Sequence, residues 1–459
     1  VRPVRVAHVT TVDLTLRFLL LGQLRRLRDE GYEVWAVSAP GPWAADLEAE
    51  GIRHLPWPHA TRSWDPASDA RALAELVGLL RRGRFDLVHT HNPKPGVLGR
   101  LAARLAGVPC VVNTVHGYYA TPEDPPARRA AVLGLERLAA RLSDLELFQS
   151  EEDLRWARRA RVVPPGRAVF LGNGTDLARF DPAAVDPGRA AALRAELGIP
   201  EGAPVVGTVG RLVAEKGYRE LFEAASAIRA RRPEVRFLAV GAPDTGKADA
   251  IGPRELEAAR ADVVFCGWRE DVRDLLALVD VFVLPSWREG VPRSAIEAAA
   301  MGRAMVLTDI RGCREVARDG REALLVPPRA PAELAAAIEQ LKRRMIEDAL
   351  RECGSKTRAA ERLGIPTRVL PAAVGATDDY IGPGYGILTE AAREALLLCA
   401  RTEGLILDPV YTAKAFSALI DQVRRGAIGP DETVVFVHTG GLPITFAYSE
   451  EILAGLAGA

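Results

Sequence analysis

The stretch that decides the fold is residues 281–298, which read VFVLPSWREGVPRSAIEA. An apolar run ends at Leu284, a loop of small and charged residues follows, and an Ala-rich helical pattern begins near Arg293. Strand, loop and helix in this order form the repeating unit of a parallel sheet covered by helices. Because loop N–H groups would lie at the positive end of the helix dipole, we expect a ligand site here.

The same unit recurs along most of the chain. Short β-branched runs predict strands over 4–9, 32–38, 52–55, 85–90, 110–115, 145–149 and 169–172, and again over 205–209, 236–240, 263–265, 281–284, 305–307 and 323–326. Ala/Leu/Arg-rich patterns predict helices that include 14–29, 67–82, 96–106, 127–142, 218–230, 253–259 and 332–342. The fold class we expect is therefore α/β, with two Rossmann-like, doubly wound parallel sheets in tandem.

Length and composition fit this division of the chain. A chain of 459 residues, 48% of them apolar, has material for two or three domains. We expect domains at 1–172 and 173–344, meeting at the flexible turn Gly172-Asn173-Gly174, then a helical linker at 345–377 and a C-terminal part at 378–459. We expect residues 345–370 of this linker to form two short helices, split at Cys353-Gly354.

Charge and cysteine content exclude some classes of protein. The 60 basic and 60 acidic residues cancel, which gives no overall field favouring nucleic acid or membrane. Five scattered cysteines without metal-finger spacing indicate reduced thiols in a cytoplasmic protein. With no signal peptide pattern and no apolar stretch long enough to span a bilayer, we expect a soluble chain. Only six of the basic residues are lysines, so each lysine attracts attention.

Two loops of the second half carry residues suited to a phosphorylated ligand. Glu289 projects from the loop quoted above, and Glu297 lies one turn into the following helix, where a carboxylate can hold a vicinal diol. Acids that merely complement the helix dipole are the alternative. The segment 210–217, GRLVAEKG, follows strand 205–209, and its Arg211 and Lys216 suit phosphate. A solvated surface pair is the alternative there.

The first half offers weaker candidates. His116 ends strand 110–115 and is either a contact to a sugar or leaving phosphate, or a structural histidine. His89 and His91 suggest a metal, but the pattern names no third ligand, so we expect no metal. Lys94 precedes a helix start and suits an anionic acceptor.

On these motifs, residues 1–344 resemble the family 4 retaining glycosyltransferases of the GT-B fold, in which two Rossmann-like domains face each other across a cleft. The motifs are the Glu289/Glu297 pair, Arg211 with Lys216, Gly172-Asn173-Gly174-Thr175-Asp176, and His116-Gly117. The resemblance implies that Arg211 and Lys216 hold the donor diphosphate and act in catalysis together with Glu289 and His116. It implies that Glu297 binds the ribose, and that Glu289 with Gly290, Val291 and Pro292 holds the sugar. It implies no metal and no cofactor.

The resemblance also bears on substrates. It implies a nucleotide-sugar donor, with UDP expected. Residues 89–96 and the following Arg100 look like members that elongate lipid-linked surface polysaccharides, implying a glycan or lipid-linked acceptor and a protein that is cytoplasmic or peripheral at the inner face of the membrane. Many relatives carry adjacent glycines after the first strand, where this chain has Thr10-Thr11-Val12. Thr11, His91 and Lys94 are the acceptor-side candidates.

The C-terminal part resembles another family. Motifs near Tyr385, Asp408-Pro409, Lys414 and Thr439 are similar to the end of D-cysteine desulfhydrase and of aminocyclopropane-carboxylate deaminase, pyridoxal-phosphate enzymes of fold type II. The resemblance implies a short α/β extension without the Schiff-base lysine or phosphate loop, so we expect neither bound pyridoxal phosphate nor lyase activity.

The linker and the end of the glycosyltransferase part leave two questions open. The linker is similar to a helix-turn-helix, but we expect a generic linker rather than DNA binding; a non-catalytic, regulatory fusion chain is the remaining alternative. GT-B enzymes end in a helix that crosses back onto the first domain, and nothing after Lys342 resembles it.

Overall fold

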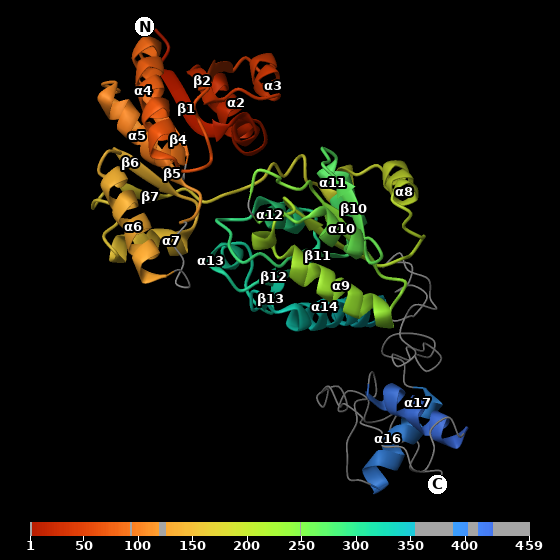
Figure 1. The fold of residues 1–459 in the computed structure, drawn as a ribbon. Helices are drawn as coiled ribbons and strands as arrows, with labels where there is room; N and C mark the ends of the chain where they lie inside the picture. Colours follow the sequence, from red (N-terminus) through yellow and green to blue (C-terminus); the bar gives the residue numbers. More distant parts are fainter. Residues whose placement is uncertain are drawn as a thin grey trace. The chain divides into compact units, whose positions relative to one another are not determined.

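The computed structural model describes residues 2–91, 94–118, 125–247, 249–353, 389–402 and 412–425. The chain divides into two compact units, Val1–Leu341 and Lys342–Ala459. Thirteen strands of the first unit form two sheets, both entirely parallel (Figure 1).

The first sheet has seven strands in the order β3-β2-β1-β4-β5-β6-β7. Helices α4 (Pro66–Gly83) and α5 (Lys94–Leu105) cover one face, and α2 (Leu21–Asp29) and α3 (Ala44–Ala49) cover the other (Figure 1). This doubly wound arrangement places the loops that follow the strands at one edge of the sheet. The strands are β1 (Arg5–Val12), β2 (Glu33–Ala39), β3 (Arg53–Pro56), β4 (Leu87–His91), β5 (Cys110–Val115), β6 (Leu145–Phe148) and β7 (Ala168–Phe170).

The second sheet has six strands in the order β10-β9-β8-β11-β12-β13. The strand order reverses between β8 and β11, which is where open α/β sheets bind ligands. The strands are β8 (Val205–Val209), β9 (Arg236–Val240), β10 (Val263–Gly267), β11 (Val281–Leu284), β12 (Ala304–Thr308) and β13 (Ala323–Val326).

The helices of the first unit begin at local sequence signals. Asp65, Ser150 and Asp186 each cap a following helix by accepting a backbone N–H with the side chain. The helices are α1 (Asp13–Thr15), the π-helix η1 (Leu16–Leu20), α2 (Leu21–Asp29), α3 (Ala44–Ala49), α4 (Pro66–Gly83), α5 (Lys94–Leu105), α6 (Pro126–Ala140), α7 (Glu151–Arg159), η2 (Pro182–Ala184), α8 (Pro187–Glu196), η3 (Ala214–Lys216), α9 (Tyr218–Arg231), α10 (Pro253–Ala259), α11 (Val272–Leu278), α12 (Arg293–Ala300), α13 (Arg311–Arg314) and α14 (Pro331–Cys353).

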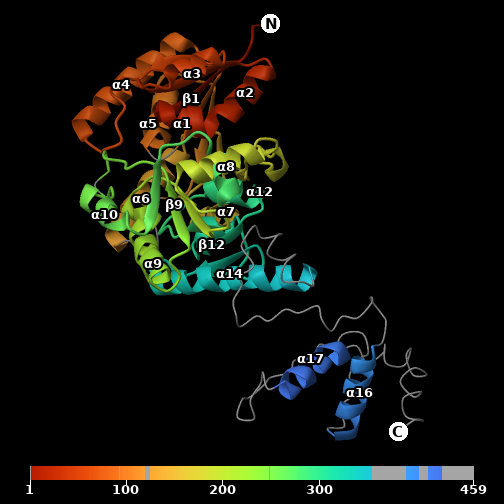
Figure 2. The ribbon, with the colours of Figure 1, turned by 90° about the vertical axis from the view of Figure 1, so that its right-hand side faces the viewer.

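The predicted fold class is confirmed, but the predicted end of the helix over 332–342 is wrong. That helix, predicted to end at Lys342, continues as α14 to Cys353 and includes the first of the two short helices predicted after it. The physical reason is the composition of α14, which has no Gly or Pro after Pro331 to stop it. Both views place α14 beside α9, and Arg231 pairs with Glu339 at 3.1 Å between them (Figure 1, Figure 2).

Besides the end of α14, two helices of the second unit lie within the described residues. They are α16 (Glu390–Thr402) and α17 (Thr412–Arg424). The two helices pack against each other, with Ala392, Ala395, Leu396 and Ala413 buried and an ion pair of 2.6 Å between Glu394 and Arg424. The motifs predicted near Tyr385, Asp408 and Thr439, and the second short helix of the linker, lie outside the described residues. Among the helices in the described ranges, none combines the length and apolar character needed to span a bilayer.

Candidate active site

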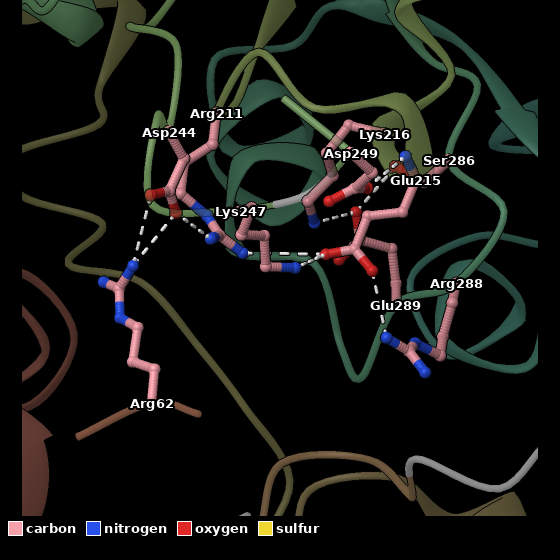
Figure 3. A network of polar contacts seen from close by, with 10 residues as sticks. All are labelled: Arg62, Arg211, Glu215, Lys216, Asp244, Lys247, Asp249, Ser286, Arg288 and Glu289. Atoms are coloured by element: carbon pink, nitrogen blue, oxygen red, sulfur yellow. Dashed lines mark hydrogen bonds and ion pairs between the residues drawn. The ribbon is translucent and has the colours of Figure 1, made fainter. Parts of the chain in front are cut away.

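The carboxyl ends of β8 and β11 bring two of the predicted site residues into direct contact. Lys216, in η3 after β8, donates from Nζ to Oε1 of Glu289 at 2.5 Å (Figure 3). Ser286 donates from Oγ to the same oxygen at 2.7 Å. The Glu289 side chain is only 9% exposed, so the lysine compensates a nearly buried charge. This pair marks the reversal point of the second sheet as the candidate active site.

Arg211, on the same loop, points to a second anionic partner. Its Nη1 lies 2.6 Å from Oδ2 of Asp244, and the same oxygen lies 3.0 Å from Nη1 of Arg62, which belongs to the first sheet's part of the chain (Figure 3). Burial opposes ionisation of Asp244, but hydrogen bonding and charge from Arg211 and Arg62 outweigh it and hold the pKa of that carboxyl below its ordinary value. Asp244 is therefore a carboxylate shared by two guanidinium groups.

Glu215 organises the other cations of this loop. It pairs with Lys247 and, at 2.9 Å, with Arg288. Its backbone N–H donates to Oδ2 of Asp249 at 3.1 Å. Burial raises the pKa of Glu215, but the hydrogen bond and charge of Lys247, with the charge of Arg288, prevail and lower it. The result is a dense network of alternating charges around the predicted phosphate site (Figure 3).

Gly290 is packed too tightly for any side chain. A Cβ built on it would lie 1.7 Å from the carbonyl oxygen of His116, and a Cβ on Gly117 would lie 2.8 Å from Cα of Gly290. A Cβ on Gly312 would likewise lie 1.9 Å from the oxygen of Gly290. The loops after β5, β11 and β12 therefore meet at Gly290, and the predicted pair His116-Gly117 lies against the predicted sugar-binding loop.

The other predicted donor residues lie on or just before α12. Glu297 is mostly buried and sits 3.5 Å from Arg293; burial raises its pKa, and the charges of Arg293 and Arg179 only partly offset this. The Glu297 side chain thus pairs with Arg293, whereas Glu289 pairs with Lys216. Pro292 is the N-cap of α12, and the carbonyl of Val291 accepts a hydrogen bond from Asn173 at 2.9 Å. The turn at 172–174 thus contacts the donor loop.

His116 is partly buried and continues a chain of imidazoles whose other members, His91 and His8, are buried. Its Nδ1 lies 3.1 Å from Oε1 of Gln149, its Nε2 lies 3.0 Å from Nδ1 of His91, and Nε2 of His91 lies 3.2 Å from Nδ1 of His8. Because the Gln149 oxygen only accepts, His116 Nδ1 carries a proton, and each neutral imidazole in turn accepts from the next. Burial lowers the pKa of His116 to about 4 and that of His8 to about 3, so both rings are neutral near pH 7.

The sequence left the His89/His91 pair without a third metal ligand, and the structure places His8 beside it. Candidate ligand atoms of these three histidines lie within 4.8 Å of one another. However, the rings of His89 and His91 stack at a centroid distance of 4.4 Å, and His89 bonds Thr114 at 2.7 Å. Stacked rings do not converge on one point, so the geometry favours a hydrogen-bonded imidazole chain over a metal centre.

The remaining acceptor-side candidates are Lys94 and Thr11. Lys94 is 3% exposed and pairs with Asp69, Thr61 and Ser63, so its ammonium group serves the protein's own loop. Thr11 is partly buried near the end of β1. Sequence reasoning missed Arg62, Asp244 and Gln149; their contacts join segments far apart in the chain, and no local pattern indicates them.

Comparison with known proteins agrees with this geometry. Residues 20–174 match the model of the family described as glycosyl transferase 4-like domain, and residues 203–344 match that of glycosyl transferases group 1. The chain is 30% identical to an Escherichia coli UDP-Gal:alpha-D-GlcNAc-diphosphoundecaprenol alpha-1,3-galactosyltransferase over 314 residues, 67% of this chain and 80% of the relative. The chain therefore belongs to this family of glycosyltransferases.

A solved structure shows the same fold. The Anabaena protein Alr3699/HepE, crystallised with UDP and glucose, superposes with a TM-score of 0.61 at 21% identity, over 79% of this chain and 93% of that one. This likeness confirms the GT-B fold.

The C-terminal resemblance is confirmed as well. Residues 308–440 match a model described as pyridoxal-phosphate dependent enzyme. A stretch of 75 residues is 47% identical to D-cysteine desulfhydrase of Salmonella typhi, covering 16% of this chain and 23% of that enzyme. The start of the family match overlaps the glycosyltransferase match, but β13 pairs with β12 in the second sheet, so residues up to Leu341 belong structurally to the glycosyltransferase.

Proposed function

We propose that the protein is a retaining glycosyltransferase that moves a sugar from a nucleoside diphosphate, UDP, to a hydroxyl group of a lipid-linked glycan. The observation that carries the proposal is the contact of Lys216 with Glu289 at the reversal point of the second sheet, with Arg211 on the same loop. Cations at strand ends suit a diphosphate, and a carboxylate beside them suits sugar hydroxyls.

The chemistry assigns each residue a task. The bond between the donor's anomeric carbon and the phosphate oxygen breaks, and Arg211 and Lys216 stabilise the charge that develops on the departing diphosphate. The acceptor oxygen attacks from the face that the diphosphate leaves, and its proton passes to a phosphate oxygen. Glu289 and the amides of 290–292 hold the sugar, Glu297 holds the ribose, and the carbonyl of His116 lies beside Gly290. No residue in this scheme requires a metal or cofactor.

The acceptor is proposed from the relatives. The Escherichia coli relative acts on a sugar linked to diphosphoundecaprenol, and so does a Campylobacter jejuni N-acetylgalactosaminyltransferase that is 24% identical over 342 residues. A lipid-linked glycan places the enzyme in the cytoplasm or at the inner face of the membrane. We also propose that residues 1–172 and 173–344 are the two domains of this enzyme.

A pyridoxal-phosphate lyase is the second candidate, because the tail matches that family. The matched stretch spans 23% of the desulfhydrase, so we expect the lyase to be incomplete. Adding pyridoxal phosphate to the full chain is expected to leave it without the yellow Schiff-base absorbance; a yellow, borohydride-reducible adduct with D-cysteine turnover would favour the lyase.

Titration of the full chain with UDP and UDP-sugars, followed by transfer to a synthetic sugar-diphospholipid, tests the main proposal. We expect binding below millimolar concentration and a product whose anomeric configuration, read by NMR, equals that of the donor. Glu289→Gln should slow transfer about a hundredfold without weakening UDP binding, since it removes sugar contacts but keeps both cations of the diphosphate subsite. Glu223→Gln, exposed on α9, is the matched control. Absence of nucleotide binding, or an inverted product, would contradict the proposal.

A further inference from the structure

The loop between β3 and α4 presents Arg62 in a fixed position. Its neighbours Thr61 and Ser63 both bind the buried Lys94, through Thr61 Oγ1 at 2.9 Å and the Ser63 carbonyl at 2.6 Å. Asp69, on α4, pairs with the same ammonium group. A rare lysine therefore anchors the chain on both sides of Arg62, so less conformational entropy is lost when Arg62 binds a partner.

The partner of Arg62 is the carboxylate that also holds Arg211. The Asp244 oxygen lies 3.0 Å from Arg62 and 2.6 Å from Arg211, so two guanidinium groups from opposite sheets converge on one anion (Figure 3). The Asp244 side chain is 14% exposed, whereas those of Arg62 and Arg211 are 46% and 43% exposed. Nearly half of each arginine side chain is therefore exposed and can meet an incoming ligand.

Two guanidinium groups on one carboxylate form an arrangement that also suits phosphate. Both anions accept paired N–H bonds from an arginine fork, but a diphosphate carries more charge and more acceptor oxygens than one carboxylate. A nucleoside diphosphate at Arg211 would therefore compete with Asp244 for the two guanidinium groups.

We propose that Arg62 is a further cation of the donor's diphosphate subsite, supplied by the first sheet, and that Asp244 occupies this subsite until a nucleoside diphosphate displaces it. This inference rests on the proposed function, because it places the diphosphate at Arg211. It gives Arg62 a role in selecting nucleoside diphosphates over nucleosides, and it makes the negative charge of Asp244 an internal competitor of the donor.

The test measures the dissociation constants of UDP and of uridine for the full chain and its variants. Arg62→Ala should weaken UDP binding about tenfold and leave uridine binding unchanged, and Arg62→Lys should restore part of the loss. Asp244→Asn, which removes the competing charge, should tighten UDP binding about three- to tenfold. Arg314→Ala is the control. Arg314 is 41% exposed and also joins the parts of the two sheets, through an ion pair of 3.0 Å with Glu152, but it does not belong to the network around Arg211.

The sign of each effect separates the alternatives. If Arg62 and Asp244 only clamp the two sheets together, Arg62→Ala and Asp244→Asn should change UDP and uridine affinity alike, as Arg314→Ala does, and the inference fails. Tighter UDP binding by Arg62→Ala, or weaker binding by Asp244→Asn, also overturns it. If the wild-type chain binds no UDP at all, the proposed function itself fails, which is a different result from normal UDP binding that ignores Arg62.

Discussion

The two carboxylates Glu289 and Glu297 differ in their surroundings, so substituting each of them should have a different effect. Glu289 is compensated by Lys216, whereas burial raises the pKa of Glu297. If Glu297 accepts hydrogen bonds from the ribose hydroxyls, UDP affinity should fall as the pH drops through this raised pKa. The reason is that the protonated carboxyl group of Glu297 accepts fewer hydrogen bonds. Glu297→Gln should weaken UDP about tenfold at neutral pH and remove this acid dependence. Calorimetric titrations over mildly acidic to neutral pH check both effects; an unchanged pH profile would contradict the ribose role.

Gly290 gives a second prediction for a single residue. A Cβ there would overlap the carbonyl of His116, so Gly290→Ala must push the loops after β5 and β11 apart. We expect transfer to fall at least about tenfold, since small displacements of reacting groups reduce rates strongly. Gly134→Ala is the control, because nothing lies within 4 Å of a Cβ at that helical glycine. Equal transfer rates in the two variants would show that this close approach has no part in catalysis.

Residues whose partners follow from strand order were predictable, and others were not. The meeting of Lys216 and Glu289 follows from two strand ends at one sheet edge, and local motifs mark both residues. Arg62 and Asp244 lie 182 positions apart, in loops that belong to different sheets, and no spacing rule connects them. Lys94 shows the converse: its rarity attracted an acceptor hypothesis, but the structure uses the buried ammonium group to bind its own loop.

At the scale of elements, the imidazole chain across β1, β4 and β5 predicts a pH-dependent stability. In the folded state burial holds the pKa of His8 at about 3, below its ordinary 6.5. Between these values the unfolded chain binds the extra proton, so the free energy of unfolding falls as pH decreases, by about 1.4 kcal/mol per pH unit and histidine. His8→Asn should reduce this slope by about that amount in urea unfolding between about pH 5 and 6.5. His59→Asn, with a 55% exposed side chain, is the control; equal slopes in wild type and His8→Asn would contradict the buried neutral state.

Strands were predicted better than helix ends for a physical reason. Strands 110–115, 205–209, 236–240, 281–284 and 323–326 have the same bounds in sequence and structure, because buried parallel strands are short apolar runs between polar turns. The end of α14 was wrong because helix formers continue past Lys342 and the apolar pattern fades gradually. The π-helical turn η1 inside the helix predicted over 14–29 left no sequence signal.

At the scale of the whole molecule, two unlike matches share one chain. The glycosyltransferase match ends at residue 344 and the pyridoxal-phosphate match begins at 308, yet the structure divides the chain at Leu341. The overlap contains the last residue of β12, α13, β13 and the first part of α14, and β13 is the edge strand of the second sheet. Because β13 pairs with β12 in the second sheet, the overlapping residues up to Leu341 belong to the glycosyltransferase part, although they also match the pyridoxal-phosphate family.

This division predicts the effect of ending the chain after Cys353. All strands of the described residues and every proposed site residue lie within Val1–Leu341, and α14 would remain whole. We expect the shortened protein to keep the wild-type UDP affinity within about twofold and the melting temperature of its glycosyltransferase part, measured by calorimetry. Ending the chain after Gly320, which removes β13 and α14, should prevent folding, because it leaves the hydrogen-bonding edge of the buried strand β12 without its partner. If ending the chain after Cys353 instead lowers UDP affinity tenfold or more, the tail contributes to the active site and takes the place of the helix that closes other GT-B enzymes.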